Sequence, residues 1–357
     1  MRRITIKYAR PGMVVELPVY DCWGNLLLDK NLELKPAGIE EMSKRGVTEI
    51  FIRDGRVTDV VVSPLFSPQS EGALAKAFRW LVQDNSSKQT ISDGHLAHVN
   101  ATMIAMVNEI SARKANDINV ACNISAKDYV YLQPIKTAAL SMAMANALKL
   151  PPADILVIGM AAVLKDICLP VDVINSMDSL ADSESLIIRD HPTKAFRMLS
   201  RHRATVGAVA TAVNQHHETW SGTGFPMQLK SKGISFAARI IAIADVFVDL
   251  LSDRPGRSKY MPHEAIEGIM AGGGDQFDPD LVELFARRIP SYPAGLSVQL
   301  NNGDSGIVTN PRLGFIARPV VRVCSKADQG ELKEPFDIDL AKVEYQRMLV
   351  TKVLEYD

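Results

Sequence analysis

Two adjacent histidines, His216 and His217, stand out in a chain of 357 residues that contains only seven histidines. They follow an apolar stretch with helical spacing and precede Glu218 and a glycine-containing loop. Imidazole nitrogens are common ligands of transition metals, so the pair indicates a metal site. The alternative is a pair of partly exposed histidines stabilised by the dipole of a helix end.

Two aspartates lie where a lone carboxylate would be costly. Asp166 ends the apolar run 155–164, and Asp245 lies inside the apolar run 240–247. Removing a charged carboxylate from water is costly unless a partner compensates its charge. Each of these aspartates therefore needs a cation or a metal ion beside it. Together with His191, these side chains suit iron, manganese or zinc better than magnesium or calcium. Alternatively, Asp245 pairs with an arginine and His191 caps a helix.

The order of these motifs resembles the HD-GYP family. Lys165-Asp166 is followed by His191-Pro192 and by the long motif 216–226, and Asp245 comes later in the chain. The matching region covers residues 128–288. The motif loop of the family corresponds here to Gly222, Gly224, Phe225 and Pro226, with Phe225 in place of the family's tyrosine.

The resemblance implies a two-metal site of which one half is lost. The ligands of the second metal correspond to Asp166, His191, His216 and His217, and this set is complete. The first metal keeps only Asp166 and Asp245, because Gln133 and Lys165 stand where the family has histidines. An ammonium group cannot bind a metal. We therefore expect one transition metal ion, iron or manganese, with zinc as a further option.

Two interpretations of Lys165 remain open. Its ammonium could take the place of the lost metal and neutralise Asp245, or it could point to solvent. Asp166 and Lys165, which form the altered HD dipeptide, are the predicted catalytic positions. The segment after Asp166 also lacks the lysine that the family has there.

The resemblance further implies cyclic di-GMP or a related cyclic dinucleotide as the ligand. Arg254 and Arg257 match positions that bind its phosphates in the family. The forked guanidinium group of arginine is well suited to phosphate oxygens. We weigh two functions: a phosphodiesterase of weak or lost activity, and a non-catalytic module that binds the dinucleotide or a signalling protein.

The helical spacing of apolar residues predicts a mainly α fold of the HD type, an all-α bundle over residues 71–290. Short β-like segments predict a small α+β module over residues 1–67 and a β-rich extension over 291–357. Ser67-Pro68-Gln69-Ser70 is interpreted as a linker. Helices are expected at Pro36–Arg45, Ser125–Leu148, from Pro151-Pro152, Ser183–Asp190, Pro192–Ser200, Ala204–His217, Phe236–Leu251, Pro262–Met270 and Asp280–Arg288. Strands are expected at Val14–Val19, Leu26–Leu28, Glu49–Ile52, Leu296–Leu300, Gly306–Thr309 and Pro319–Val323.

The composition of the chain limits the classes of partner that it is expected to bind. Forty basic residues nearly balance 41 acidic residues, so no overall field would draw the chain to nucleic acid or to an anionic membrane. The longest apolar stretch is too short to span a bilayer, and the first residues lack the apolar core of a secretory signal. The four scattered cysteines form no zinc motif. We expect a cytoplasmic protein.

Overall fold

The computed structural model describes residues 1–62, 64–88, 90–113, 118, 129–176, 186–202, 207–253, 257–314 and 317–354. They belong to two compact units. The first contains residues 1–64, 261–264 and 286–357, and the second contains residues 65–260 and 265–285. The first unit thus joins the two terminal segments, while the division of the chain into three domains stays a prediction.

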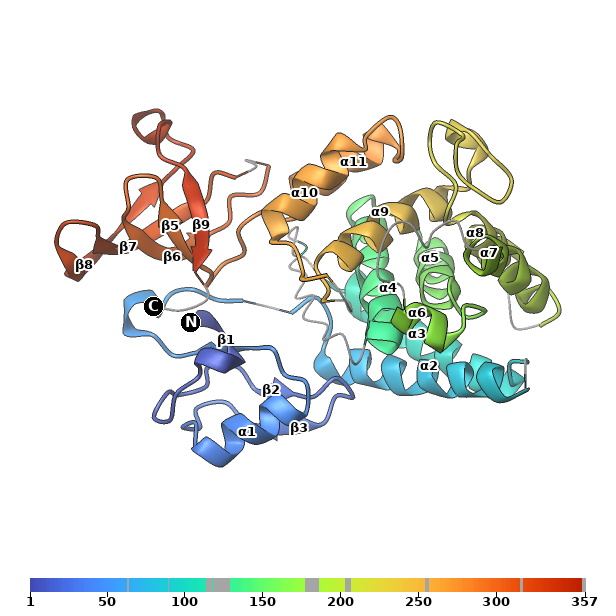
Figure 1. Ribbon diagram of the computed structural model, residues 1–357, viewed down its shortest axis with the longest axis horizontal. Coiled ribbons are helices and arrows are strands. Elements are labelled where there is room, and N and C mark those ends of the chain that lie inside the picture. Colours follow the sequence, from blue (N-terminus) through green and yellow to red (C-terminus); the bar gives the residue numbers. More distant parts are fainter. Residues whose placement is uncertain are drawn as a thin grey trace. The chain divides into compact units, whose positions relative to one another are not determined.

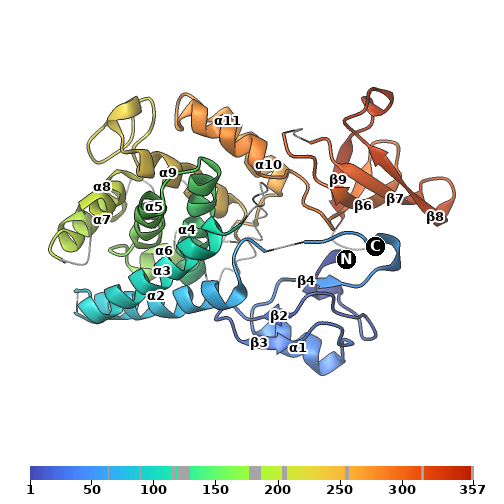
Figure 2. The same cartoon turned by 180° about the vertical axis from the view of Figure 1, so that it is seen from behind.

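The second unit is helical, and the predicted mainly α fold is confirmed (Figures 1 and 2). Among the described helices, none combines the length and apolar character that crossing a membrane requires. The helices are α2 (Pro68–Lys88), α3 (Asp93–Ser111), α4 (Tyr129–Ala147), α5 (Pro152–Leu164), α6 (Val171–Ser176), α7 (Leu186–Leu199), α8 (Gly207–Gln215) and α9 (Phe236–Leu250), followed by α10 (Pro262–Ala271) and α11 (Pro279–Arg288).

Helix α5 is the centre of this unit because it is apolar on nearly every side. Its residues from Ile158 to Leu164 are all buried, as expected for a helix without a polar face. Gly159 lets α4 and α3 approach closely, since a Cβ atom there would lie 2.6 Å from the sulfur of Met142 and 2.7 Å from that of Met103. The helix therefore holds the residues that follow it, Lys165 and Asp166, at a rigid position.

Two predictions about where helices begin are wrong. Ser67 to Ser70 is not a linker, because α2 begins at Pro68 and the Ser67 hydroxyl accepts a hydrogen bond from the Ser70 amide at 3.2 Å. Proline suits the first turn of a helix, where its missing N–H is not needed. His191-Pro192 does not open a helix either, because α7 runs from Leu186 through Pro192. The predicted helix start at Ser125 to Asp128 lies outside the described residues.

The first unit combines a small α+β part with a five-stranded antiparallel sheet of order β8-β7-β6-β5-β9. Three predicted C-terminal strands are present, but β8 and β9 were not predicted. β8 is exposed along most of its length, so it lacks the alternating apolar pattern on which strand prediction depends. The elements are β1 (Arg2–Thr5), β2 (Val19–Tyr20), β3 (Leu26–Leu28), α1 (Pro36–Lys44), β4 (Glu49–Ile52), β5 (Ser297–Leu300), β6 (Ser305–Asn310), β7 (Val320–Lys326), β8 (Gly330–Asp339) and β9 (Val350–Leu354).

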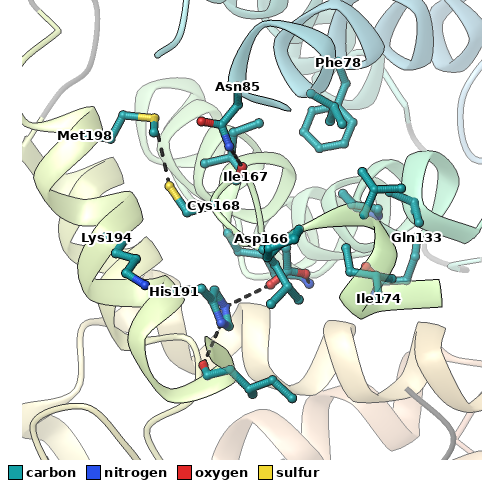
Figure 3. A pocket seen from close by; sticks show the side chains of 18 of the residues that line it. Phe78, Asn85, Gln133, Asp166, Ile167, Cys168, Ile174, His191, Lys194 and Met198 are labelled. Carbon is teal, nitrogen blue, oxygen red and sulfur yellow. Dashed lines mark hydrogen bonds and ion pairs between the residues drawn. The ribbon is translucent and has the colours of Figure 1, made fainter. Parts of the chain in front are cut away.

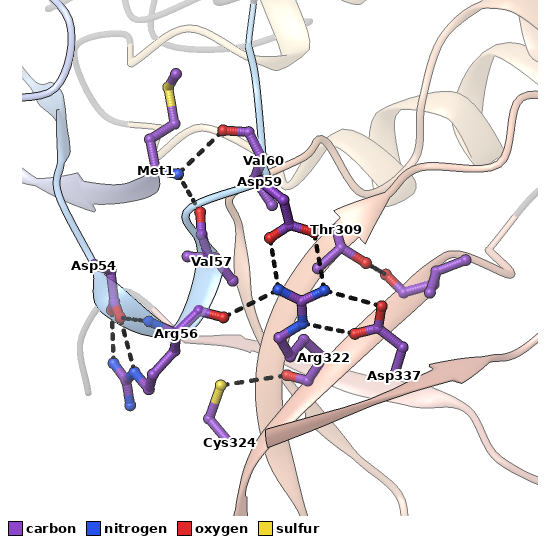
Figure 4. A network of polar contacts seen from close by, with 11 residues as sticks. Met1, Asp54, Arg56, Val57, Asp59, Val60, Thr309, Arg322, Cys324 and Asp337 are labelled. Carbon is purple, nitrogen blue, oxygen red and sulfur yellow. Dashed lines mark hydrogen bonds and ion pairs between the residues drawn. The ribbon is translucent and has the colours of Figure 1, made fainter. Parts of the chain in front are cut away.

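Arg322 on β7 ties the two parts of this unit together (Figure 4). Its guanidinium donates to Asp59 at 2.6 and 3.0 Å, to Asp337 at 2.7 and 3.0 Å, and to the carbonyl oxygen of Arg56 at 3.1 Å. The hydrogen bond from Arg322 lowers the pKa of Asp59. Beneath this network lies an apolar cluster of Met1, Val57, Val60, Val62, Ile307 and Cys324.

This apolar cluster predicts where the first unit is sensitive to mutation. Ile307 is fully buried, so Ile307→Ala should lower the free energy of unfolding by about 2 to 5 kcal/mol, as large-to-small core changes do. Val343 is 80% exposed, and Val343→Ala should change it by less than about 0.5 kcal/mol. Urea unfolding of both variants measures the difference. Equal stabilities would contradict the packing of the N-terminal segment on β6.

Candidate metal centre

Pro192 explains how His191 is oriented. A proline inside a helix has no N–H to donate to the carbonyl four residues earlier, which here is that of Ile188. The Nδ1 atom of His191 lies 2.7 Å from that carbonyl oxygen, so Nδ1 carries the hydrogen and donates it. The lone pair of Nε2 is then directed away from the helix, toward Asp166 (Figure 3). Hydrogen bonds of this kind fix the ring of a metal-binding histidine.

His216 is held in the same way at the end of α8. Its Nδ1 atom donates to the carbonyl oxygen of Val213 at 2.7 Å, one of the carbonyls that a helix end leaves without a backbone partner. Its ring is almost completely buried, with 3% of the residue exposed. The next residue, His217, turns its ring to within 4.0 Å of the His216 ring centre. Both histidines therefore face one point.

The free ring nitrogens and one carboxylate oxygen converge on that point. His191 Nε2 lies 3.3 Å from His216 Nε2, and these two atoms lie 3.2 and 3.5 Å from Asp166 Oδ1. Ligand atoms of Asp166, His191, His216 and His217 all lie within 4.8 Å of one another. Burial lowers the pKa of His191 and, further, that of His217, which favours neutral rings. Lone pairs gathered this closely fit a metal cation.

A loop between α8 and α9 positions His217. The buried Glu218 carboxylate accepts hydrogen bonds from the amides of Met227 at 2.6 Å and Leu229 at 2.9 Å, which closes the loop. The Phe225 ring stacks on His217, with ring centres 4.7 Å apart and planes inclined by 24°. Gly224 is required here, because a Cβ atom would lie 2.4 Å from the carbonyl oxygen of His217.

Lys165 lies between two carboxylates instead of pointing to solvent. Only 2% of the residue is exposed. Its ammonium contacts Asp166 and lies 2.9 Å from Asp245 Oδ1. Gln133 also points to this carboxylate, since its amide donates to Asp245 Oδ1 at 2.5 Å. Asp245 therefore has two nitrogen donors, and among the described residues it lies outside the cluster of four possible metal ligands, as its assignment to the other, incomplete metal site implies.

The ionisation of this pair follows from its surroundings. Burial alone would lower the pKa of Lys165, but Asp166 and Asp245 raise it above its usual value. Burial alone would raise the pKa of Asp166, but the adjacent Lys165 ammonium holds it well below its usual value. Both groups are therefore charged near neutral pH.

The site opens into a cavity of about 1130 Å³ lined by residues of the helical unit (Figure 3). This exceeds the volume of about 300 to 1000 Å³ that is typical for drug-sized ligands. Of the predicted phosphate-binding residues, Arg254 lies outside the described residues. Arg257 donates to the backbone oxygen of Asp249 at 2.6 Å and lies 3.3 Å from its carboxylate, so its guanidinium is already engaged.

A model of the family described as HD domain matches residues 98–281, which is just over half of the chain. The chain belongs to the HD domain family. The predicted resemblance is thereby confirmed at the level of the family.

Individual proteins with known names are also similar to this chain. An HD-type relative from Pseudomonas aeruginosa, named cyclic di-GMP phosphodiesterase PA4108, is 30% identical over 266 residues, which cover 72% of this chain and 61% of that protein. The cyclic di-GMP phosphodiesterase response regulator RpfG of Xanthomonas campestris is 28% identical over 65% of this chain and 61% of its own length. The chain thus spans about three fifths of these relatives. A solved HDGYP protein from Bdellovibrio bacteriovorus, Bd1817, shares the fold, with a TM-score of 0.50, 15% identity and coverage of 79% of this chain and 97% of that chain.

Some features of this HD domain were not predicted from the sequence. The role of Glu218 in closing the loop was missed, although a glutamate directly after two histidines was visible. Lys194, Arg197 and Arg201 line the cavity, and no motif marked them. Their spacing of three and four residues along one helix was the available signal.

Gly224 provides a test of how the loop positions His217. Gly224→Ala should cost about 1 to 3 kcal/mol of stability and reduce metal binding, because the added methyl group meets backbone atoms that cannot move aside. Gly233→Ala is the matched control, since a Cβ atom there meets nothing within 4 Å. Thermal unfolding and metal content of the two variants give the answer. Equal behaviour would show that the loop does not hold the site.

Proposed function

We propose that this HD domain binds one transition metal ion and a cyclic dinucleotide, and that its phosphodiesterase activity is weak or absent. The observation that carries this proposal is the position of Lys165, whose ammonium lies between Asp166 and Asp245. The metal is iron or manganese, with zinc as a further option, because imidazole and carboxylate ligands suit these ions. The ligand is cyclic di-GMP, the substrate named for the relatives, or a related cyclic dinucleotide.

The four clustered side chains are suited to hold the ion. His191 and His216 present Nε2 atoms whose rings are fixed by backbone carbonyls, and Asp166 and His217 complete the group. A metal ion bound there would act as a Lewis acid toward a phosphate oxygen and would lower the pKa of a water molecule. The residues themselves supply the orientation of the ligand atoms.

Lys165 substitutes for only part of what a second metal would do. Its ammonium neutralises Asp245 and Asp166, so the partly buried carboxylates need no metal ion at that position. It has no empty coordination position, and its charge is shared between two carboxylates. Two-metal sites stabilise both the attacking and the leaving oxygen of a phosphodiester. The rate of hydrolysis should therefore fall more than the affinity for the ligand.

A second candidate function, a non-catalytic binding module, is favoured by Gln133 and Lys165. Both side chains donate to Asp245 and together fill the place of ligands. Retention of the other four ligands favours a residual enzyme. The two functions differ in one measurement: hydrolysis of cyclic di-GMP by the metal-loaded protein, compared with its binding under the same conditions.

Metal content tests the ligand assignment. The purified protein should contain about one transition metal ion per chain, and His216→Ala should remove it and lower the melting temperature, because an ion that binds only the folded state stabilises it. His98→Ala is the matched control, since the ring of this histidine lies against Trp80 of α2, with ring centres 5.4 Å apart, and is not in the cluster. Elemental analysis reads the result. Two ions in the natural protein, or an unchanged content in His216→Ala, would overturn the assignment.

Restoring the lost histidines tests the position of Lys165. Both Gln133 and Lys165 place a nitrogen within 2.9 Å of Asp245 Oδ1, so histidines there would face the same carboxylate. The double variant Gln133→His/Lys165→His should raise metal content toward two per chain. Each single variant should leave the content near one, because one ligand is still missing.

Activity of the double variant should rise less than its metal content. The lysine that normally follows the HD dipeptide is absent, and a misplaced catalytic group can cost about a hundredfold in rate. Metal content that stays near one in the double variant would show that the helices do not retain the geometry of the first site.

A further inference from the structure

The helix that presents His191 also carries a row of basic side chains into the cavity. Residues of α7 and its C-terminal turn line the cavity at intervals of three and four, which places them on one face of the helix. On this face His191 is followed by Lys194, Arg197 and Arg201 (Figure 3 shows Lys194 beside His191). With a rise of about 1.5 Å per residue, Arg197 starts about 9 Å along the axis from His191.

Two of these cations are not neutralised by carboxylates. Within the described ranges, Arg197 and Arg201 have no ion-pair partner, and both are exposed. Lys194 lies 3.7 Å from Asp190, an exposed pair one helical turn apart that contributes little. His202, at the end of the row, contacts Asp93 at 2.7 Å. The positive charge of this wall therefore remains available to an anion.

The acidic residues that line the cavity are engaged elsewhere. Asp166 and Asp245 share the Lys165 ammonium. Asp249 accepts from the Tyr129 hydroxyl at 2.5 Å and contacts Arg257. The cavity thus has the cluster of possible metal ligands at one side and a positively charged wall along α7. None of its described lining residues is an unpaired carboxylate.

We infer that Arg197 and Arg201, with Lys194 beside them, form a second phosphate subsite of this cavity. This subsite binds the second phosphate of a dinucleotide whose first phosphate lies at the cluster of possible metal ligands. This inference rests on the proposed function and specifies its ligand as one with two phosphates. The guanidinium forks suit phosphate oxygens, and they supply the attraction that Arg257, engaged with Asp249, does not.

The experiment measures binding by calorimetry with two probes, cyclic di-GMP and the mononucleotide GMP. Arg197→Gln/Arg201→Gln should weaken binding of cyclic di-GMP by about ten- to a hundredfold, while affinity for GMP changes by less than about threefold. Arg197→Lys/Arg201→Lys should retain most of the affinity. Raising the salt concentration should lower the affinity of the natural protein for cyclic di-GMP more than that of the glutamine variant, because the contact is ionic.

The matched control is Lys333→Gln/Arg347→Gln, which removes the same charge from exposed positions in the other unit. It should bind both probes like the natural protein. Failure of the natural protein to bind cyclic di-GMP would refute the proposed function and this inference with it. Binding by the natural protein that the glutamine variant retains in full would refute the subsite alone. An equal loss for GMP would also refute it, since the arginines would then act only as a general attraction.

Discussion

The buried ammonium of Lys165 is the interaction on which the rest of this site depends. Two partly buried carboxylates, Asp166 and Asp245, lie just after one apolar helix and inside another, where a neighbouring cation offsets the cost of removing them from water. In a two-metal site the ion supplies that charge. Here the Lys165 side chain lies beside both carboxylates, and on the proposed function it takes the place of that ion. The cost is chemical, because an ammonium offers no coordination position to a water molecule or a phosphate.

Backbone geometry accounts for the half of the site that is retained. Pro192 removes one helix hydrogen bond, and His191 uses the carbonyl of Ile188 that is left over. The end of α8 leaves the carbonyl of Val213, and His216 uses that one. Both rings are thus oriented by features of the main chain rather than by other side chains. The orientation of these two rings therefore does not depend on Lys165 or Gln133, whose side chains contact Asp245.

The sequence predicted the mainly α fold from the spacing of apolar residues, and the resemblance to the HD-GYP family implied the residues of the cluster. Apolar spacing marks α5 and α9, and the motif around His216 and His217 is long. Contacts across the chain could not be predicted in the same way. Whether Lys165 turned to Asp245 or to solvent depended on the packing of α4, α5 and α9. Arg257 showed the same limit, because its partner Asp249 became evident only in the folded chain. The continuous helix through Pro192 was missed because proline usually marks a helix start.

The distribution of positive charge is why we propose ligand binding rather than hydrolysis. The Lys165 charge is directed inward and consumed by two carboxylates, so it adds little attraction for a ligand in the cavity. Arg197 of α7 and Arg201 in the turn that follows lie on the cavity wall without carboxylate partners among the described residues, so their charge is available to an anion that enters. A second metal would have joined attraction and chemistry at one point. With the proposed subsite, the attraction for a phosphate would lie along α7, away from Asp166, where it would hold a phosphate without assisting its cleavage.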